Sequence, residues 1–292
     1  MSDPMRKTST IVVIQTLSVL AACLLASVQL PAAPQTAKTW ALVVGVSKFQ
    51  RLPSDLWLQY PETDARMFAR FVQSPRGGGV PAEQLLVMTN EQATSAGVRE
   101  AFSNFLKKPG KDDTVFILFA SHGLAGERGA YVLTYDSDTE NLANTAIPMA
   151  ELRAMVEDEL KRAGHVVFLA DVCHAAAIAG QKTDAVSGAV AGLGDAPGEM
   201  LGLMAARPKE VSFEGPEYGG GHGAFTWSVL RGLSGEADLD KDGFVSAGEL
   251  IDFVTGDVAK LTKRKQNPRD FGNMENGTKL ADLSKPGIAL GQ

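Results

Sequence analysis

Five short apolar runs, separated by longer amphipathic stretches, constrain the fold of this chain more than any other feature. Each run has the length of a strand and is almost continuously apolar, as expected when helices cover both faces of a sheet. The runs are residues 40–46, 85–88, 114–120, 165–170 and 201–206. This alternation predicts an α/β fold in which a mostly parallel central sheet is flanked by helices on both faces.

The stretches between the runs have helical periodicity. Apolar residues recur every three or four positions in 63–72, 95–106 and 148–162, and two further helices are expected over 224–230 and 247–261. The apolar stripes of these helices are expected to form the core. Candidate functional residues are therefore sought at the ends of the strands.

An export segment precedes the predicted fold. Two basic residues stand before the apolar run 11–30, and small, turn-prone residues follow that run. This order is typical of a cleaved signal peptide, predicted here as residues 1–35. Two other forms remain open, namely lipidation at Cys23 and an uncleaved membrane anchor. All three predict a periplasmic or secreted protein that touches the membrane only through this segment.

Charge and cysteine content exclude several classes of function. There are 28 Lys and Arg against 34 Asp and Glu, a net charge of -6, so no nucleic-acid partner is expected. The two cysteines, Cys23 and Cys173, cannot form a disulfide framework or a cysteine-rich zinc site. Without the export segment, Cys173 is the only cysteine in an oxidising compartment, and its surroundings must explain its presence.

The residues at the carboxyl ends of the predicted strands are candidates for chemistry, because ligands of open α/β sheets bind there. His122 follows the run 114–120, and Cys173 follows the run 165–170. A single helical crossover joins these strands, so they are predicted neighbours. A thiolate at Cys173 can attack a carbonyl carbon while His122 carries protons. The backbone N–H of Gly123 can stabilise the resulting oxyanion.

The other three histidines are less suitable partners for the thiol. His174 is adjacent to Cys173 and should face the opposite side of the same strand. His165 begins that strand at its far end, and His222 lies in a glycine-rich turn before a predicted helix. We interpret His165 and His222 as hydrogen-bonded structural histidines.

This arrangement resembles the caspase and metacaspase group of cysteine peptidases. In that group a strand ending in His-Gly lies about 50 residues before a strand ending in Asp-x-Cys. His122 and Cys173 match this order, and segments 40–46, 63–65 and 221–226 resemble other conserved parts of the family. The resemblance implies a caspase-like peptidase domain over 40–265, with a polar tail over 266–292. It also implies a cysteine endopeptidase that acts on polypeptides without an organic cofactor.

The chain departs from bacterial members of the family at two places. Those members usually have Ser-Gly before the histidine, where this chain has Ala120 and Ser121. They also have Asp-x-Cys-x-Ser-Gly, where this chain has Ala175 and Ala176. An alternative function therefore stays open, a catalytically silent, calcium-binding scaffold of the same fold that recognises peptides or a partner protein.

The resemblance also implies a specificity pocket for Arg or Lys. In metacaspase-like enzymes the aspartate that matches Asp171 accepts the side chain before the scissile bond, and Asp64 matches a second acidic position. Asp64 has an alternative interpretation as a carboxylate that favours a helix N-terminus. Residues 180–198 are rich in Gly and Ala and are predicted to be a linker. Within it, Lys182 is the candidate self-cleavage site.

Residues 238–249 fit the twelve-residue EF-hand calcium loop, with acidic groups at positions 1, 3 and 5, glycine at 6 and glutamate at 12. Glycines interrupt the segment before it, so one calcium site without a paired EF-hand is expected. Extracellular calcium can keep even a weak site filled, which favours a structural role. The predicted ligands are Asp238, Asp240, Asp242, the Phe244 backbone, Ser246 and Glu249.

Overall fold

The computed structural model describes residues 37–126, 129–174, 199–207 and 210–290. The predicted export segment, the linker 180–198 with Lys182, and the pair Ala175 and Ala176 lie outside the described residues. Within the described ranges, none of the helices combines the length and apolarity that crossing a bilayer requires.

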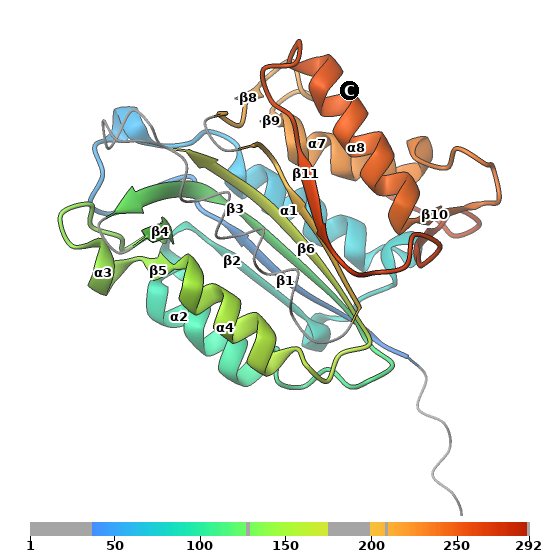
Figure 1. Ribbon diagram of the computed structural model, residues 1–292, viewed down its shortest axis with the longest axis horizontal. Coiled ribbons are helices and arrows are strands. Elements are labelled where there is room, and N and C mark those ends of the chain that lie inside the picture. Colours follow the sequence, from blue (N-terminus) through green and yellow to red (C-terminus); the bar gives the residue numbers. More distant parts are fainter. Residues whose placement is uncertain (1–36, 127–128, 175–198, 208–209, 291–292) are drawn as a thin grey trace, which may run out of the picture. The chain divides into compact units, whose positions relative to one another are not determined.

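A mostly parallel sheet forms the centre of the domain, as predicted (Figure 1). Its strands follow the order β11-β7-β6-β3-β1-β2, and every pair along this path is parallel except β11 with β7. The path consists of β1 (Thr39–Gly45), β2 (Leu85–Thr89), β3 (Thr114–Gly126), β6 (His165–His174), β7 (Glu199–Met204) and β11 (Arg269–Gly272).

Six shorter strands attach loops to this sheet or to one another. Two of them extend the main sheet: β4 pairs antiparallel with the carboxyl end of β3, and β5 pairs antiparallel with β4. The other four form two separate pairs, β8 with β9 and β10 with β12. They are β4 (Gly129–Val132), β5 (Ile147–Pro148), β8 (Glu214–Gly215), β9 (His222–Gly223), β10 (Phe244–Ser246) and β12 (Lys279–Asp282).

Helices cover both faces of the sheet, and each face has its own hydrophobic core. On one face α1 (Pro61–Gln73), α7 (Ala224–Arg231) and α8 (Ala247–Leu261) supply buried residues to one cluster. On the other face α2 (Ser95–Glu100) and α4 (Met149–Glu159) supply the second. Short helices complete the chain: η1 (Ser54–Leu56), η2 (Pro75–Gly77), η3 (Ala82–Gln84), η4 (Asn90–Gln92), α3 (Leu142–Thr145) and the π-helical segments η5 (Ala101–Phe105) and η7 (Gly232–Glu236).

Strands β3 and β6 run further than the apolar pattern predicts. The sequence analysis ends them at residues 120 and 170, whereas their ladder continues to the pair Gly123 and His174. The apolar pattern stops early because polar side chains begin there, but the backbone hydrogen bonding of the strands does not stop. His122 and Cys173 consequently lie inside paired strands, where the backbone fixes their relative position.

The polar segment after residue 265 is part of the folded domain. β11 forms an edge of the main sheet beside β7, and β12 pairs with β10. Met274, Leu280 and Ala281 are buried in the core on the α8 side. β11 has no apolar pattern in the sequence because three of its four residues are exposed, and β12 offers only two buried apolar residues, too few for a strand to be predicted.

Candidate active site

The strand register places the two predicted catalytic residues side by side. His122 of β3 and Cys173 of β6 are partners in the parallel ladder, and neighbouring strands lie about 4.8 Å apart. Gly123 follows in the same ladder, with His174 on one side and Val132 of β4 on the other. The predicted pair therefore occupies one level of the sheet.

The ring of His122 is held in one orientation. It is 8% exposed and stacks on Phe49, with ring centroids 5.2 Å apart and an interplanar angle of 26°. Its Nε2 lies 2.7 Å from the carbonyl oxygen of Leu56. A carbonyl oxygen only accepts hydrogen bonds, so Nε2 carries the ring proton in the neutral form.

The other ring nitrogen of His122, Nδ1, is the candidate proton acceptor. Nδ1 of His122 is buried and has no hydrogen-bond partner in the part of the chain that the structure describes. Burial lowers the pKa of His122, and the bond to Leu56 only partly offsets that effect. The ring is therefore neutral near pH 7, with a lone pair available at Nδ1 for a proton.

The two contacts that hold this ring leave no signal in the sequence. Phe49 and Leu56 both belong to the loop of residues 46–60, which connects β1 to α1. Leu56 contributes only its carbonyl oxygen, so the identity of its side chain carries no signal. Phe49 is 1% exposed, and a lone phenylalanine in a loop is indistinguishable from an ordinary core residue.

The structure brings both predicted pocket aspartates to one small cavity beside these strands. Asp171 is 6% exposed, and its two oxygens accept hydrogen bonds from the Ser212 and Thr226 hydroxyls, each at 2.8 Å. Burial raises the pKa of Asp171, an effect that these hydroxyl bonds oppose. The carboxyl group is therefore fixed in position and poorly solvated.

Asp64 faces the same cavity from the first turn of α1. Its carboxylate accepts hydrogen bonds from Nδ1 of His222 at 2.6 Å and from the backbone N–H of Gly223 at 3.0 Å. Asp64 also lies in the first turn of α1, so the alternative interpretation as a carboxylate that favours the helix N-terminus describes its position as well. Burial, together with the negative charge of Asp171, raises the pKa of Asp64 to about 7 against the effect of the His222 bond.

His222 and His165 match their structural interpretation, and the predicted direction of the His174 side chain lies outside the described part of the chain. His222 is buried, bonded to Asp64 and stacked on Trp227, with ring centroids 5.3 Å apart. His165 begins β6 at the opposite end of the sheet, with its Nε2 3.2 Å from Glu199.

A third acidic residue, Glu214 of β8, lines the cavity and was missed from the sequence because no motif surrounds it. It accepts hydrogen bonds from the backbone N–H groups of Gln59 and Tyr60, and burial raises its pKa. The cavity encloses about 10 Å³, room for roughly one water molecule. A larger side chain can enter only if the lining segments move apart.

A glycine keeps the space between the two aspartates open. A Cβ atom at Gly223 would lie 2.6 Å from Oδ2 of Asp171 and 3.2 Å from Oδ2 of Asp64. Any side chain at this position would fill the gap that separates the carboxyl groups. The cavity is thus a narrow acidic site, adjacent along β6 to Cys173.

His122 and Cys173 lie at one level of the sheet, and Asp171 lies two residues before Cys173. This arrangement agrees with a comparison against known families. The model of the caspase domain, peptidase family C14, matches residues 38–275. This chain belongs to the caspase-domain family. The match covers the whole parallel sheet and extends past β11.

A solved structure shares the architecture of this chain. A crystal structure of protein GSU0716 from Geobacter sulfurreducens is similar with a TM-score of 0.58 and 18% sequence identity. The similarity covers 86% of this chain and 100% of that chain. Among curated proteins, none matches the chain.

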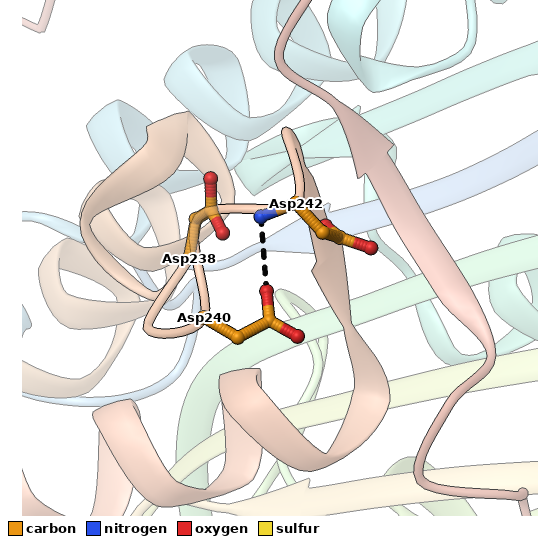
Figure 2. Close-up of side chains that lie close together, drawn as sticks. All are labelled: Asp238, Asp240 and Asp242. Carbon is orange, nitrogen blue, oxygen red and sulfur yellow. Dashed lines mark hydrogen bonds between the residues drawn. The ribbon is translucent and has the colours of Figure 1, made fainter.

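This caspase domain also carries a compact acidic loop between α7 and α8. Oxygens of Asp238, Asp240 and Asp242 all lie within 4.8 Å of one another, and Figure 2 shows the three side chains around one turn. Oδ1 of Asp238 is buried without a hydrogen-bond partner among the described residues. Gly243 has φ of 85°, the left-handed conformation that favours glycine at this turn.

The other predicted ligands of this loop are placed differently. Glu249 lies outside the cluster and accepts hydrogen bonds from the backbone N–H groups of Leu239 and Ser246, both at 2.9 Å, and from the Ser246 hydroxyl at 2.8 Å. Ser246 caps the N-terminus of α8, while Phe244 begins β10. Because β10 pairs with β12, the loop is tied to the caspase domain without a second EF-hand.

Proposed function

We propose that this caspase-domain protein is an exported cysteine endopeptidase that cleaves polypeptides after Arg or Lys. One observation carries the proposal: Nδ1 of His122, buried and without a hydrogen-bond partner among the described residues, belongs to a neutral ring whose strand partner is Cys173. A base of this kind beside a cysteine is the arrangement that nucleophilic catalysis requires.

The proposed reaction proceeds in two halves. Nδ1 of His122 removes the thiol proton, and the Cys173 sulfur attacks the scissile carbonyl carbon. The imidazolium then returns the proton to the leaving amine, so the C–N bond breaks and a thioester remains. In the second half Nδ1 takes a proton from water, whose oxygen attacks the thioester carbon. The C–S bond then breaks, the carboxylic acid product leaves, and the imidazolium returns the proton to the Cys173 sulfur. The Gly123 N–H stabilises the oxyanion in both halves.

The carbonyl of Leu56 assists both proton transfers. It accepts a hydrogen bond from Nε2 and thereby keeps Nδ1 free of its own proton. When the ring becomes an imidazolium, the same bond becomes charge-assisted and stronger. This contact corresponds in function to the orienting group of a catalytic triad.

The acidic cavity explains the proposed preference for basic side chains. Asp64 and Asp171 are buried and have raised pKa values, so the surrounding groups of the free protein only partly stabilise the negative charge of their ionised forms. A guanidinium or ammonium group supplies the missing positive charge. Entry of such a side chain requires the lining segments to open, since the cavity holds about one water molecule.

Amide hydrolysis tests the proposed function. The purified protein should release the amine from a peptide amide ending in arginine, and the Cys173→Ala variant should release none. Hydrolysis of aspartyl peptides with arginyl peptides spared would refute the proposed specificity. No hydrolysis of either class would favour the silent scaffold.

Substrate binding should depend on pH because of Asp64. Its pKa of about 7 means that the free protein holds a proton there below pH 7, and a bound cation favours the ionised form. Binding a basic side chain therefore releases a proton. We expect KM for an arginyl substrate to rise as pH falls below 7, approaching about tenfold per pH unit.

Two variants test whether Asp64 causes this pH dependence of KM. Asp64→Asn should raise KM and remove the dependence, whereas His165→Gln, at the other end of the sheet, should leave it unchanged. A parent KM that is constant from pH 5.5 to 8 would contradict this role of Asp64.

We also propose that the acidic loop binds one calcium ion with a structural role. The cluster of carboxylate oxygens fits a cation that prefers oxygen ligands, as does Oδ1 of Asp238, which is buried and has no partner in the described ranges of the chain. Asp238, Asp240 and Asp242 would hold the ion, with the Phe244 carbonyl, Ser246 and Glu249 completing the set after Glu249 turns inward.

Calcium should raise the melting temperature. At a concentration about 100 times Kd, the stabilisation is about 2.7 kcal/mol, a shift of roughly 5 to 10 °C for a domain of this size. Glu249→Gln should largely remove the shift, while Asp252→Asn, on the exposed side of α8, should retain it. A melt that neither calcium nor chelator moves would exclude the site.

Export and maturation complete the proposal. Residues 1–35 direct the protein to the periplasm or the exterior, and Lys182 is the proposed site of self-cleavage. Both follow from the sequence pattern of segments that lie outside the described residues.

A further inference from the structure

Asn90, at the carboxyl end of β2, has an unusual conformation for a buried residue. It is 4% exposed, and its φ of 45° lies in the left-handed region that residues other than glycine rarely occupy. Asparagine tolerates this region better than most residues do, but such a conformation persists only where the surroundings enforce it. The contacts of its side chain indicate what enforces it here.

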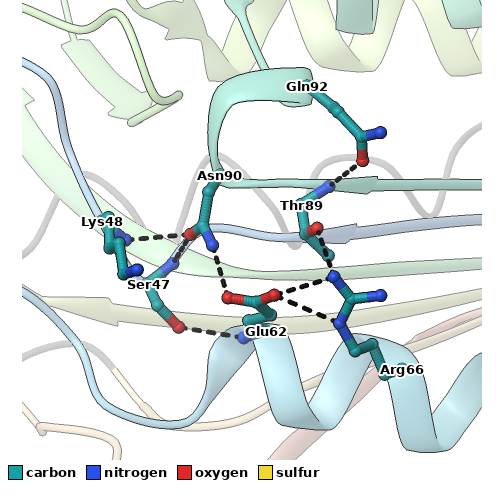
Figure 3. A network of polar contacts seen from close by, with 7 residues as sticks. All are labelled: Ser47, Lys48, Glu62, Arg66, Thr89, Asn90 and Gln92. Carbon is teal, nitrogen blue, oxygen red and sulfur yellow. Dashed lines mark hydrogen bonds and ion pairs between the residues drawn. The ribbon is translucent and has the colours of Figure 1, made fainter.

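The amide of Asn90 joins three segments of the chain (Figure 3). Its Oδ1 accepts hydrogen bonds from the backbone N–H groups of Ser47 and Lys48, both at 3.0 Å. Its Nδ2 donates to Oε2 of Glu62 at 2.5 Å. Arg66 in turn donates to Oε1 of Glu62 at 2.8 Å, which fixes the carboxylate on the surface of α1.

Ser47 connects this clamp to both ends of the loop 46–60. Its N–H is bound to Asn90, and its carbonyl oxygen accepts the N–H of Leu58 at 3.0 Å. Its hydroxyl accepts the N–H of Glu62, also at 3.0 Å. The beginning of the loop, its end and the start of α1 are therefore held together at one residue.

The same loop carries both contacts that orient the catalytic histidine. Phe49 stacks on the His122 ring, and the Leu56 carbonyl binds its Nε2. These two residues lie between the loop ends that the clamp fixes. A displacement of the loop would move the carbonyl and the stacking ring together, because both are attached to one short segment of backbone.

We propose that Asn90 is a positioning residue for His122, acting through the loop 46–60. Its amide holds the loop so that Leu56 keeps the proton on Nε2 and leaves Nδ1 free. This inference rests on the proposed function, since it assigns the clamp to the proton transfers of the Cys173 reaction. Asn90 does not touch the substrate or the reacting atoms.

Replacing Asn90 by glycine tests the contribution of the side chain without changing the backbone conformation. Asn90→Gly keeps the left-handed conformation without strain while removing all three hydrogen bonds of the amide. Misplacement of a catalytic group by about 1 Å can reduce the rate by about 10²-fold. We expect kcat for an arginyl substrate to fall by roughly that factor, with KM changing less than about threefold because the acidic cavity is untouched.

A second readout does not depend on activity. Nitrogen NMR of the His122 ring should show a fixed Nε2–H tautomer in the parent and a mixture of tautomers in Asn90→Gly, since the carbonyl contact that selects it is released. The His122 signal is assigned with a His122→Gln variant. A purely structural clamp would lower the melting temperature without changing the tautomer.

Exchanging the hydrogen-bond donor and acceptor between Asn90 and Glu62 shows whether a loss of activity comes from the lost hydrogen bond or from misfolding. Asn90→Asp retains the acceptor for Ser47 and Lys48 but sets a carboxylate against Glu62, so kcat should fall. Adding Glu62→Gln restores a donor on the opposite side, so most of kcat and the single tautomer should return. Gln92→Ala, which loses a bond to the Thr89 N–H in the same network but none to the loop, is the control and should match the parent.

The outcomes separate this inference from the proposed function. Parent-like kcat and tautomer in Asn90→Gly, or loss in the pair variant with no recovery, would overturn the positioning role while leaving the peptidase intact. A parent that hydrolyses nothing would refute the peptidase. The tautomer comparison would still decide whether Asn90 orients His122.

Discussion

Replacing His122 by alanine is expected to lower kcat/KM for an arginyl peptide amide by roughly 10³-fold. The variant loses the base that the strand register places beside Cys173, and positioned acid–base groups contribute about 10²- to 10⁴-fold to such reactions. The loss should appear in kcat with little change in KM, because the acidic cavity does not include His122. Steady-state kinetics at pH 7.5 measures both constants.

His165→Ala is the matched control for this prediction. His165 lies on β6, is hydrogen-bonded to an acidic residue and stands at the opposite end of the sheet. Its replacement should change kcat/KM by less than about twofold, as is usual for surface sites. Retention of more than a tenth of the parent activity in His122→Ala would mean that another group transfers the proton.

Replacing Asp171 by asparagine is expected to remove the preference for basic side chains. The variant keeps the volume and polar atoms that meet Ser212 and Thr226 but loses the charge. Breaking a desolvated charge pair costs about 3 kcal/mol, or roughly 10²-fold in kcat/KM for arginyl and lysyl substrates. Substrates with a neutral residue at that position should be affected much less.

Stability distinguishes this effect from misfolding. Burial raises the pKa of Asp171, so the folded protein binds a proton there more tightly than the unfolded chain does, and ionisation above the usual aspartate pKa destabilises the fold. Asp171→Asn should therefore melt at the parent temperature or above it near pH 7.5. Asp257→Asn is the control, because that carboxylate also accepts a serine hydroxyl from α7 but lies away from the cavity. An unchanged Arg-to-neutral ratio in Asp171→Asn would refute the specificity pocket.

The sequence predicted the main elements of the fold because their signals are local and strong. Runs of apolar residues identified every parallel strand, and helical periodicity identified α1, α7 and α8 to within about two residues. The pairing of β3 with β6 followed from the rule that strands joined by a single crossover usually lie side by side. The full strand order was not predicted, and the family resemblance rested on the order and spacing of His122 and Cys173 along the chain.

Other features of the site carry no local signal. Leu56 contributes a backbone carbonyl, Glu214 lies on a two-residue strand, and Asn90 matters through a loop that its own neighbours do not reveal. The edge strand β11 is mostly exposed and lacks an apolar pattern. These features arise from contacts between segments distant in sequence, so only the three-dimensional arrangement identifies them.

Covalent labelling of Cys173 tests the central claim most directly. A peptide ending in an arginyl chloromethyl ketone presents a cation to the acidic cavity and an electrophilic carbon to the nucleophile, and mass spectrometry of the digested protein locates the adduct. The account predicts one thioether on Cys173, formed quickly by the parent and at least about 10²-fold more slowly by His122→Ala. An equally fast reaction in His122→Ala, or a folded parent that stays unlabelled at Cys173, would contradict the proposed cysteine–histidine pair.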